Sequence, residues 1–155
     1  MKKKIIITTI LLILLLLLDI KLITNSNKIY GASNAGSTSD LQLMARAING
    51  EARGEPYEGQ VAVGAVILNR VSSSSFPNTI AGVIYQSGAF TAVSDGQINV
   101  PIDESSTVVK AAQDALNGWD PTHGALYYFN PNTATSSWIW SREEITTIGK
   151  HKFCR

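Results

Sequence analysis

The chain has 155 residues, with 13 Lys and Arg against 12 Asp and Glu, so its formal net charge is +1. This length allows one domain of modest size, and the balanced charge without a long basic run argues against nucleic acid as a partner. Because Cys154 is the single cysteine, no disulfide can form within the chain, and a hydrophobic core must hold the domain together.

The first residues have the pattern of an export signal. Three lysines precede an apolar run from Ile5 to Leu18, which is shorter than the roughly 20 residues of a membrane-spanning helix. We expect a signal peptide over residues 1–35 that is cleaved after Ala35, with an uncleaved N-terminal membrane anchor as the alternative. A short linker over residues 36–40 would then lead to a catalytic domain over residues 41–155. Either way, that domain works outside the cytoplasm, in the cell wall, in the spore cortex or at the outer face of the membrane.

Helical periodicity dominates the first half of the domain. A helix is predicted to begin at an N-cap formed by Ser39 or Asp40 and to end at Gly54 and Pro56. A second, buried helix is predicted over residues 56–71, and a short helical piece over 79–86. The buried face of the first helix would consist of Leu41, Met44, Ala45, Ile48 and Ala52.

The second half combines a loop, a helix and two strands. Residues 87–101 lack a sustained period, so we expect a loop there with one short hairpin at "SDGQ". A helix over 103–118 would begin at Asp103 or Ser105 and end at Gly118. Aromatic and β-branched residues predict strands over 124–131 and 144–153. The fold class is therefore α+β, mainly helical with a small antiparallel sheet.

The stretch "RAINGEARGEPYEGQ" contains three glutamates. On a helical wheel Glu51 lies at the edge of the apolar stripe, whereas Arg46 and Arg53 lie on the far side. A carboxyl group beside apolar neighbours and without an adjacent cation is expected to have a raised pKa, as a general acid requires. A solvated surface charge is the alternative for Glu51. For Glu55 and Glu58 we favour structural roles at the helix junction.

Other kinds of catalytic site find little support. The two histidines, His123 and His151, form no His-Glu-x-x-His pattern, and no cysteine pair, phosphate loop or Gly-x-Ser-x-Gly motif is present. We therefore expect neither a metal nor a cofactor. Cys154 and His151 lie together in the C-terminal tail, where an idle cysteine is favoured over a nucleophile.

Aromatic residues gather between positions 119 and 140 among amide and hydroxyl side chains. Rings with a polar rim can pack on the apolar faces of sugars. We expect one or two of these rings to line a cleft, and the alternative is that they form the core of the sheet. The cluster consists of Trp119, Tyr127, Tyr128, Phe129, Trp138 and Trp140.

Four segments together identify a family. "EARGEPYEGQVAVGAVILNRV", "FPNTIAGVIYQSGAFTAV", "DALNGWDPTHGALYYFNP" and "WIWSREEITTIGKHKFC" resemble the catalytic domain of the SleB/CwlJ cell-wall hydrolases, the spore-cortex-lytic enzymes of endospore-forming bacteria. The resemblance covers residues 41–155. It implies a lysozyme-like or lytic-transglycosylase-like domain that cuts peptidoglycan between N-acetylmuramic acid and N-acetylglucosamine.

The resemblance also assigns site residues. The first glutamate of "EARGE" is the family's acid/base and corresponds to Glu51. The resemblance implies that Phe90, Thr91, Tyr127 and Asn130 line the sugar cleft, and we add Trp138 from the aromatic cluster.

Two chemical outcomes are open. A lytic transglycosylase needs one carboxyl group and gives a 1,6-anhydro sugar, whereas a hydrolase normally needs two. We favour the transglycosylase, acting in spore cortex lysis during germination. Asp95 or Asp103 would be the second carboxylate of a hydrolase. A vegetative autolysin and a non-catalytic saccharide-binding module are the other hypotheses.

Overall fold

The computed structural model describes residues 39–155, which form one unit. The predicted signal peptide over residues 1–35 and most of the predicted linker lie outside the described residues. Within residues 39–155, none of the helices combines the length and the apolar character that crossing a bilayer requires.

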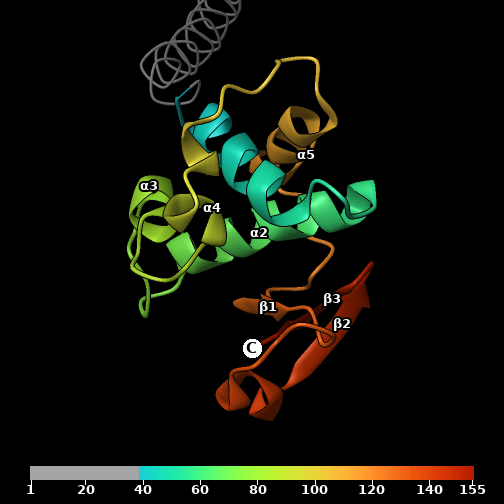
Figure 1. Cartoon of the computed structure of the whole chain (residues 1–155). Helices are drawn as coiled ribbons and strands as arrows, with labels where there is room; N and C mark the ends of the chain where they lie inside the picture. The colour runs from blue at the N-terminus through green and yellow to red at the C-terminus, as the bar shows by residue number, and fades with distance from the viewer. Residues whose placement is uncertain (1–38) are drawn as a thin grey trace, which may run out of the picture. The chain divides into compact units, whose positions relative to one another are not determined.

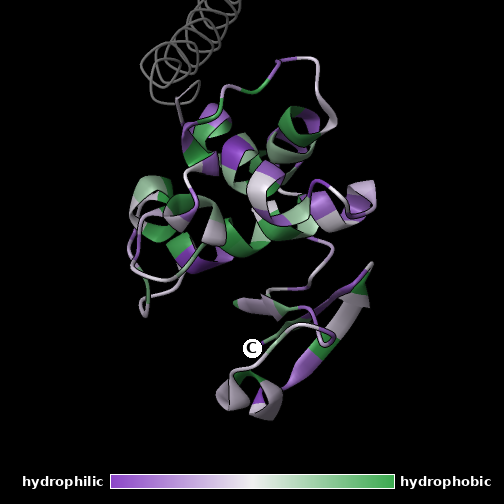
Figure 2. Ribbon diagram, viewed as in Figure 1, coloured by the Kyte–Doolittle hydropathy of each residue, from purple (hydrophilic) through white to green (hydrophobic). Residues whose placement is uncertain are grey.

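The central element is α2 (Tyr57–Ser72), a helix that is buried along most of its length. It packs against α5 (Thr107–Leu116) and α3 (Ile80–Ile84) and also contacts the sheet (Figure 1). Its middle is hydrophobic (Figure 2). A Cβ at Gly64 would lie 3.0 Å from Cβ of Ala115 and 3.2 Å from Cδ1 of Ile48. The absence of a side chain at Gly64 thus lets three helices meet closely, and the predicted buried helix is confirmed.

The helix before α2 spans residues 39–52. Its predicted apolar stripe is confirmed, since Met44, Ala45 and Ile48 are fully buried. The predicted N-cap is wrong, because Ser39 and Asp40 already have helical backbone, whereas an N-cap residue lies half outside the helix.

The segment over residues 87–101 differs from its prediction. It contains α4 (Thr91–Ser94) and the 3₁₀ helix η1 (Gln97–Asn99), so the predicted hairpin at "SDGQ" is wrong. Oδ1 of Asp95 accepts the N–H of Gln97 at 3.0 Å, and Gly96 has φ 81°. This local side-chain bond closes a turn that continues as η1, and no strand pairing forms.

The predicted C-terminal end of α5 is correct, but its predicted N-cap is not. Ser106 is the N-cap, because Asp103 instead accepts the N–H and the hydroxyl of Ser105 one turn earlier. At the other end Gly118 has φ 98°, and the N–H of Trp119 donates to the carbonyl of Asp114. The predicted termination at Gly118 is confirmed.

The sheet is antiparallel and contains β1 (Tyr127–Phe129), β2 (Glu144–Ile148) and β3 (His151–Cys154), in the order β1-β3-β2. It lies on the opposite side of α2 from α5 in Figure 1. The single strand predicted over 144–153 is in fact a hairpin, because Gly149 adopts φ 60° and turns the chain. The α+β class with a small antiparallel sheet is confirmed.

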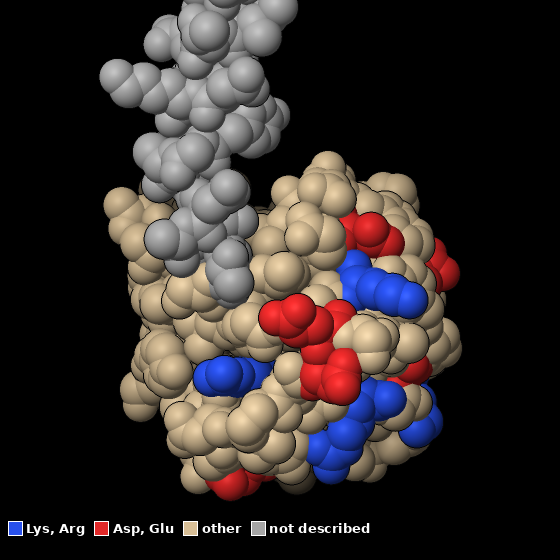
Figure 3. All heavy atoms as spheres, turned by 90° about the horizontal axis from the view of Figure 1, so that it is seen from above, with Lys and Arg blue, Asp and Glu red and all other residues tan. Residues whose placement is uncertain are grey.

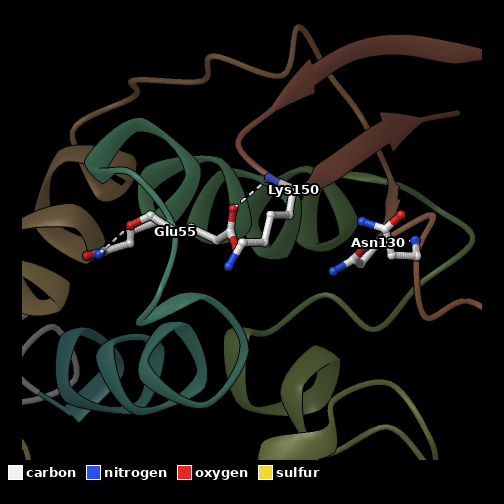
Figure 4. A network of polar contacts seen from close by, with 5 residues as sticks. Glu55, Asn130 and Lys150 are labelled. Atoms are coloured by element: carbon white, nitrogen blue, oxygen red, sulfur yellow. Dashed lines mark hydrogen bonds and ion pairs between the residues drawn. The ribbon is translucent and has the colours of Figure 1, made fainter.

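A buried glutamate joins the helix junction to this hairpin. Oε2 of Glu55 accepts the backbone N–H of Lys150 at 2.8 Å, and the Glu55 side chain is only 7% exposed (Figure 4). Nζ of Lys150 lies 4.0 Å from the other oxygen of Glu55. The structural role predicted for Glu55 is therefore confirmed, and the turn that follows the first helix is fixed to the sheet.

Charged side chains of both signs mix on the face of the described residues that Figure 3 shows. No single sign of charge dominates that face, in keeping with the formal net charge of +1. Such a mixed surface produces little long-range attraction for a polyanion.

Gly149 generates the first prediction. A Cβ there would overlap Oε2 of Glu55, and a side chain at positive φ adds backbone strain. Gly149→Ala should therefore lower the free energy of unfolding by about 3 kcal/mol. Gly118→Ala is the matched control, because Gly118 also has positive φ but open space around it, and it should cost about 1 kcal/mol. Urea denaturation measures both, and equal losses would contradict the steric role of Glu55.

Candidate active site

Glu51 lies in the last turn of the helix over residues 39–52, and both of its carboxylate oxygens have partners. Oε1 accepts the backbone N–H of Ala92 at 3.0 Å, and Oε2 accepts the hydroxyl of Tyr128 at 3.3 Å. The partners come from α4 and β1, far away in the sequence. The carboxylate is therefore held where three segments of the chain meet.

Gly50 makes the approach of α4 possible. A Cβ at Gly50 would overlap the Cβ of Ala92. Ala92 is in the first turn of α4, where backbone N–H groups have no partner inside the helix. The glycine beside Glu51 thus lets a free backbone donor reach the carboxylate.

Tyr128 is a fixed hydrogen-bond donor to Glu51. Its ring packs against His151 at 5.2 Å and against Phe153 at 5.9 Å between ring centroids. Burial, and then the negative charge of Glu51, raise the pKa of Tyr128 well above its usual value of 10. The hydroxyl therefore keeps its proton and donates a hydrogen bond to Glu51. The sequence placed Tyr128 in the aromatic cluster but gave no sign of this contact.

A pocket of about 560 Å³ adjoins Tyr128, within the size range of small-ligand sites. Tyr127 and Trp138 form part of its wall, with their rings edge to face at 5.4 Å between centroids. A polar loop of the pocket wall consists of Gln86, Ser87 and Gly88. Arg70, in the last turn of α2, also lines the pocket. Aromatic faces beside amide and hydroxyl groups suit a sugar ring.

Two of the predicted substrate-contact residues, Tyr127 and Trp138, line this pocket, and Trp138 is 49% exposed. Thr91 is exposed at the start of α4, directly before the residue that donates to Glu51. Asn130 follows β1, and its Oδ1 accepts the N–H of Asn132 at 2.9 Å (Figure 4). Asn130 is not among the residues that line the pocket.

Phe90 requires a correction. It is only 3% exposed and belongs to the hydrophobic core. Its ring lies beneath the guanidinium of Arg70, with 5.5 Å between Cζ and the ring centroid. Because a glycan cannot reach Phe90 without opening the core, we assign it a packing role in place of the predicted substrate contact.

The two aspartates considered as a second carboxylate take part in local turns. Asp95 accepts the N–H of Gln97, and Asp103 accepts two bonds from Ser105. The hydroxyl and N–H of Ser105 lower the pKa of Asp103. Neither aspartate lines the pocket or bonds to Glu51 within the described part of the chain.

Cys154 is buried, with its Sγ 3.8 Å from the carbonyl oxygen of Tyr127. Burial raises its pKa, which disfavours the reactive thiolate. Across residues 39–155, no three His, Cys, Asp or Glu side chains converge as metal ligands would.

Comparison with known proteins places the chain in a family. Residues 54–154 match the family described as Cell Wall Hydrolase. The chain belongs to this cell wall hydrolase family. Cell wall hydrolase CwlJ of Bacillus subtilis is 32% identical over 124 residues, which cover 76% of this chain and 85% of CwlJ. The family predicted from the four sequence segments is thereby confirmed.

Spore cortex-lytic enzymes are more similar to the chain. The enzyme of Bacillus cereus is 63% identical over 129 residues, which cover 83% of this chain and 49% of that protein. The chain thus spans about half the length of this curated relative. The crystal structure of the Bacillus cereus SleB catalytic domain is 65% identical, with a TM-score of 0.72, and the match covers 76% of this chain and 91% of that domain. The predicted lysozyme-like fold is confirmed.

A second solved structure has a more specific description. The catalytic domain of the germination-specific lytic transglycosylase SleB from Bacillus anthracis is 66% identical to the chain. Its TM-score is also 0.72, and the match covers 75% of this chain and 93% of that domain.

The contact between Glu51 and Tyr128 leads to a prediction. Tyr128→Phe removes the hydroxyl but keeps the ring packed on His151 and Phe153. If Glu51 is the acid of the reaction proposed below, kcat should fall about tenfold, since a hydrogen bond to a charged group contributes about 1.5 kcal/mol or more. Tyr85→Phe is the control, because Tyr85 is an exposed tyrosine and its loss should leave kcat unchanged. Equal kcat values in the two variants would contradict a role for the Tyr128 hydroxyl.

Proposed function

We propose that this chain is an exported enzyme that cuts peptidoglycan glycan strands between N-acetylmuramic acid and N-acetylglucosamine. Glu51 is its acid/base, and the reaction is that of a lytic transglycosylase in spore cortex lysis during germination. The observation that carries the proposal is that two donors hold the Glu51 carboxylate and that one of them, Tyr128, also lines an aromatic pocket. The description of the Bacillus anthracis SleB structure as a lytic transglycosylase supports the same reaction.

The first step of the proposed reaction is protonation of the leaving group. Glu51 gives its proton to the glycosidic oxygen as the bond from that oxygen to C1 of the muramic acid breaks. Positive charge develops on C1 and the ring oxygen in an oxocarbenium-like state. The N–H of Ala92 and the hydroxyl of Tyr128 keep the new carboxylate in place, so no side chain has to move during the step.

The second step closes a ring within the substrate. The 6-hydroxyl oxygen of the muramic acid bonds to C1, and its proton passes to the Glu51 carboxylate, which restores the acid. The products are an N-acetylglucosamine end and a 1,6-anhydromuramic end. One carboxyl group serves both steps, which suits a site where Asp95 and Asp103 are engaged in turns of their own.

The candidates for substrate contact are still Thr91, Tyr127, Asn130 and Trp138. Tyr127 and Trp138 have the best support, because they line the pocket.

We also infer export from the lysines and the apolar run at the N-terminus. N-terminal sequencing of the protein recovered outside the cytoplasm separates cleavage after Ala35 from an intact membrane anchor, and recovery only from the cytoplasm would contradict export.

The proposed reaction predicts the products of digestion. Purified cortex and vegetative wall, digested separately and analysed by mass spectrometry, should yield 1,6-anhydromuramic ends, with faster release from cortex. Glu51→Gln keeps the shape of the side chain but removes the acid, so cleavage should fall by about a thousandfold or more. Glu58→Gln is the matched control, since Glu58 is exposed in the first turn of α2, and it should retain full activity.

Four results would contradict parts of the proposal. Reducing ends in place of anhydro ends would indicate hydrolysis. Faster release from the vegetative wall would indicate an autolysin. Full cleavage by the Glu51→Gln variant would show that Glu51 is not the acid/base. Binding without cleavage by the unmodified chain would indicate a saccharide-binding module.

A further inference from the structure

Two exposed aromatic rings lie side by side where α2 begins and α5 ends. Tyr57 is the first residue of α2, and Trp119 follows the glycine that terminates α5. Their ring centroids are 6.1 Å apart, with 46° between the ring planes. Tyr57 is 37% exposed and Trp119 is 44% exposed. We call this pair the aromatic platform.

Hydrogen bonds to Asp114 fix both members of the platform. The hydroxyl of Tyr57 donates to Oδ2 of Asp114 at 2.7 Å, and the backbone N–H of Trp119 donates to the carbonyl of Asp114 at 3.0 Å. Partial burial, and then the bond to Asp114, raise the pKa of Tyr57 to about 12, so the hydroxyl keeps its proton. Because the fold holds these side chains in place, a ligand that packs on them loses little affinity to side-chain ordering.

The last turns of α5 add polar groups close to the platform. Gln113 and Asn117 are exposed, and Nε2 of Gln113 donates to Oδ1 of Asn117 at 3.2 Å. Within residues 39–155, the second carboxylate oxygen of Asp114 accepts no hydrogen bond. Aromatic faces beside amide and carboxylate groups suit a sugar, since the rings pack on its apolar face and the polar groups bind its hydroxyls.

The size of the platform favours a sugar over a protein as its ligand. An aromatic side chain has an area of about 150–250 Å², so at these exposed fractions the two rings offer no more than about 200 Å². Each partner in a stable protein complex contributes about 800 Å². A sugar ring is similar in size to an aromatic ring and can be covered by this platform.

The platform is separate from the pocket that Tyr128 lines beside Glu51. Neither Tyr57 nor Trp119 lines that pocket, which Arg70 borders from the last turn of α2. The axis of α2 runs about 20 Å from Tyr57 to Arg70 at 1.5 Å per residue. In Figure 1, α5 and the sheet lie on opposite sides of α2. One sugar therefore cannot occupy both places, whereas a wall built of many glycan strands can.

We propose that the aromatic platform is a second, non-catalytic glycan-binding site, which holds the chain on the wall while the pocket acts on another stretch of glycan. A sugar ring packs on Trp119, and its hydroxyls bind Asp114 and the amides of Gln113 and Asn117. Two contacts with one insoluble network make the second binding event local, which strengthens retention. The identity of the ligand rests on the proposed function, and the site goes beyond it because it takes no part in the reaction.

The first test measures retention on insoluble cortex. The full chain carries Glu51→Gln, so that the ligand is not consumed. Adding Trp119→Ala should raise the apparent Kd in co-sedimentation with purified cortex about fivefold, and Trp119→Phe, which keeps a ring, should raise it less. Tyr85→Ala is the matched control, because Tyr85 is exposed to a similar extent but lies outside the platform and the pocket. Equal Kd values for Trp119→Ala and Tyr85→Ala would overturn the inference.

The second test separates retention from catalysis. With the active chain, Trp119→Ala should raise the apparent KM for insoluble cortex about fivefold. For the shortest soluble cortex fragments that the wild-type chain cuts, kcat and KM should stay at wild-type values, because such fragments fill the pocket alone. An equal rise in KM for both substrates would show that Trp119 acts through folding or through the pocket, and would overturn the inference.

The third test needs no variant of Trp119 and covers the case in which Trp119→Ala does not fold. The chain has three tryptophans, so nuclear magnetic resonance can follow each indole N–H while pure soluble glycan fragments are added to the Glu51→Gln chain. The Trp119 signal should shift with a Kd different from that of Trp138, which lines the pocket. A Trp119 signal that does not move would overturn the inference, and weaker cortex retention by Trp119→Ala would then indicate a protein ligand.

These outcomes are separable from that of the proposed function. If the wild-type chain cuts no glycan, the proposed function fails, and co-sedimentation and the Trp119 signal still decide whether the platform binds glycan. If the wild-type chain cuts glycan but the Trp119 signal does not move, the platform inference fails and the glycan-cleaving function stands.

Discussion

The site depends on the two hydrogen bonds that the Glu51 carboxylate accepts from Ala92 and Tyr128. A carboxylate at the end of a helix would otherwise sample several rotamers in water. Here one oxygen is fixed by α4 and the other by β1, so the packing of helices and sheet around α2 determines where the acid lies. Gly50 permits the contact with Ala92. The hydrogen bond that Glu55 accepts from the N–H of Lys150 fixes the turn after the same helix to the hairpin of β2 and β3.

Local patterns in the sequence predicted most of the helices and gave Glu51 a position at the edge of the apolar stripe, and we propose that this residue is the acid/base. The apolar stripe of residues 41–52 located Glu51 at its edge, and the aromatic cluster supplied the pocket wall. The donors to Glu51 were not predictable, because Ala92 and Tyr128 are separated from it by 41 and 77 positions, and no local period reports such a contact. The hairpin at Gly149 was missed for a related reason: the β-branched residues form one continuous strand pattern, and a single glycine decides the turn.

Arg70 illustrates a second limit of the sequence. Its position near the end of an apolar helix is typical of a cation that interacts with the helix dipole and stays in water. The structure buries it because three aromatic rings and a backbone carbonyl, contributed by later segments, surround it. Periodicity gives the face of a helix on which a residue lies, but only the packed neighbours show whether a charge on that face has a partner.

The pocket and Glu51 have one requirement in common, which is that a reacting group is held in a fixed position. In a transglycosylase the attacking oxygen belongs to the substrate, so the enzyme needs to hold one sugar ring firmly and has no water molecule to position. Holding the ring converts ring closure into a reaction between groups already in contact, a gain that reaches several kcal/mol in well-oriented intramolecular reactions. A sugar ring packed on Tyr127 and Trp138 would be held in the pocket that Tyr128 also lines, while the hydroxyl of Tyr128 fixes Glu51. Substrate choice and reaction geometry would then depend on the same small set of contacts.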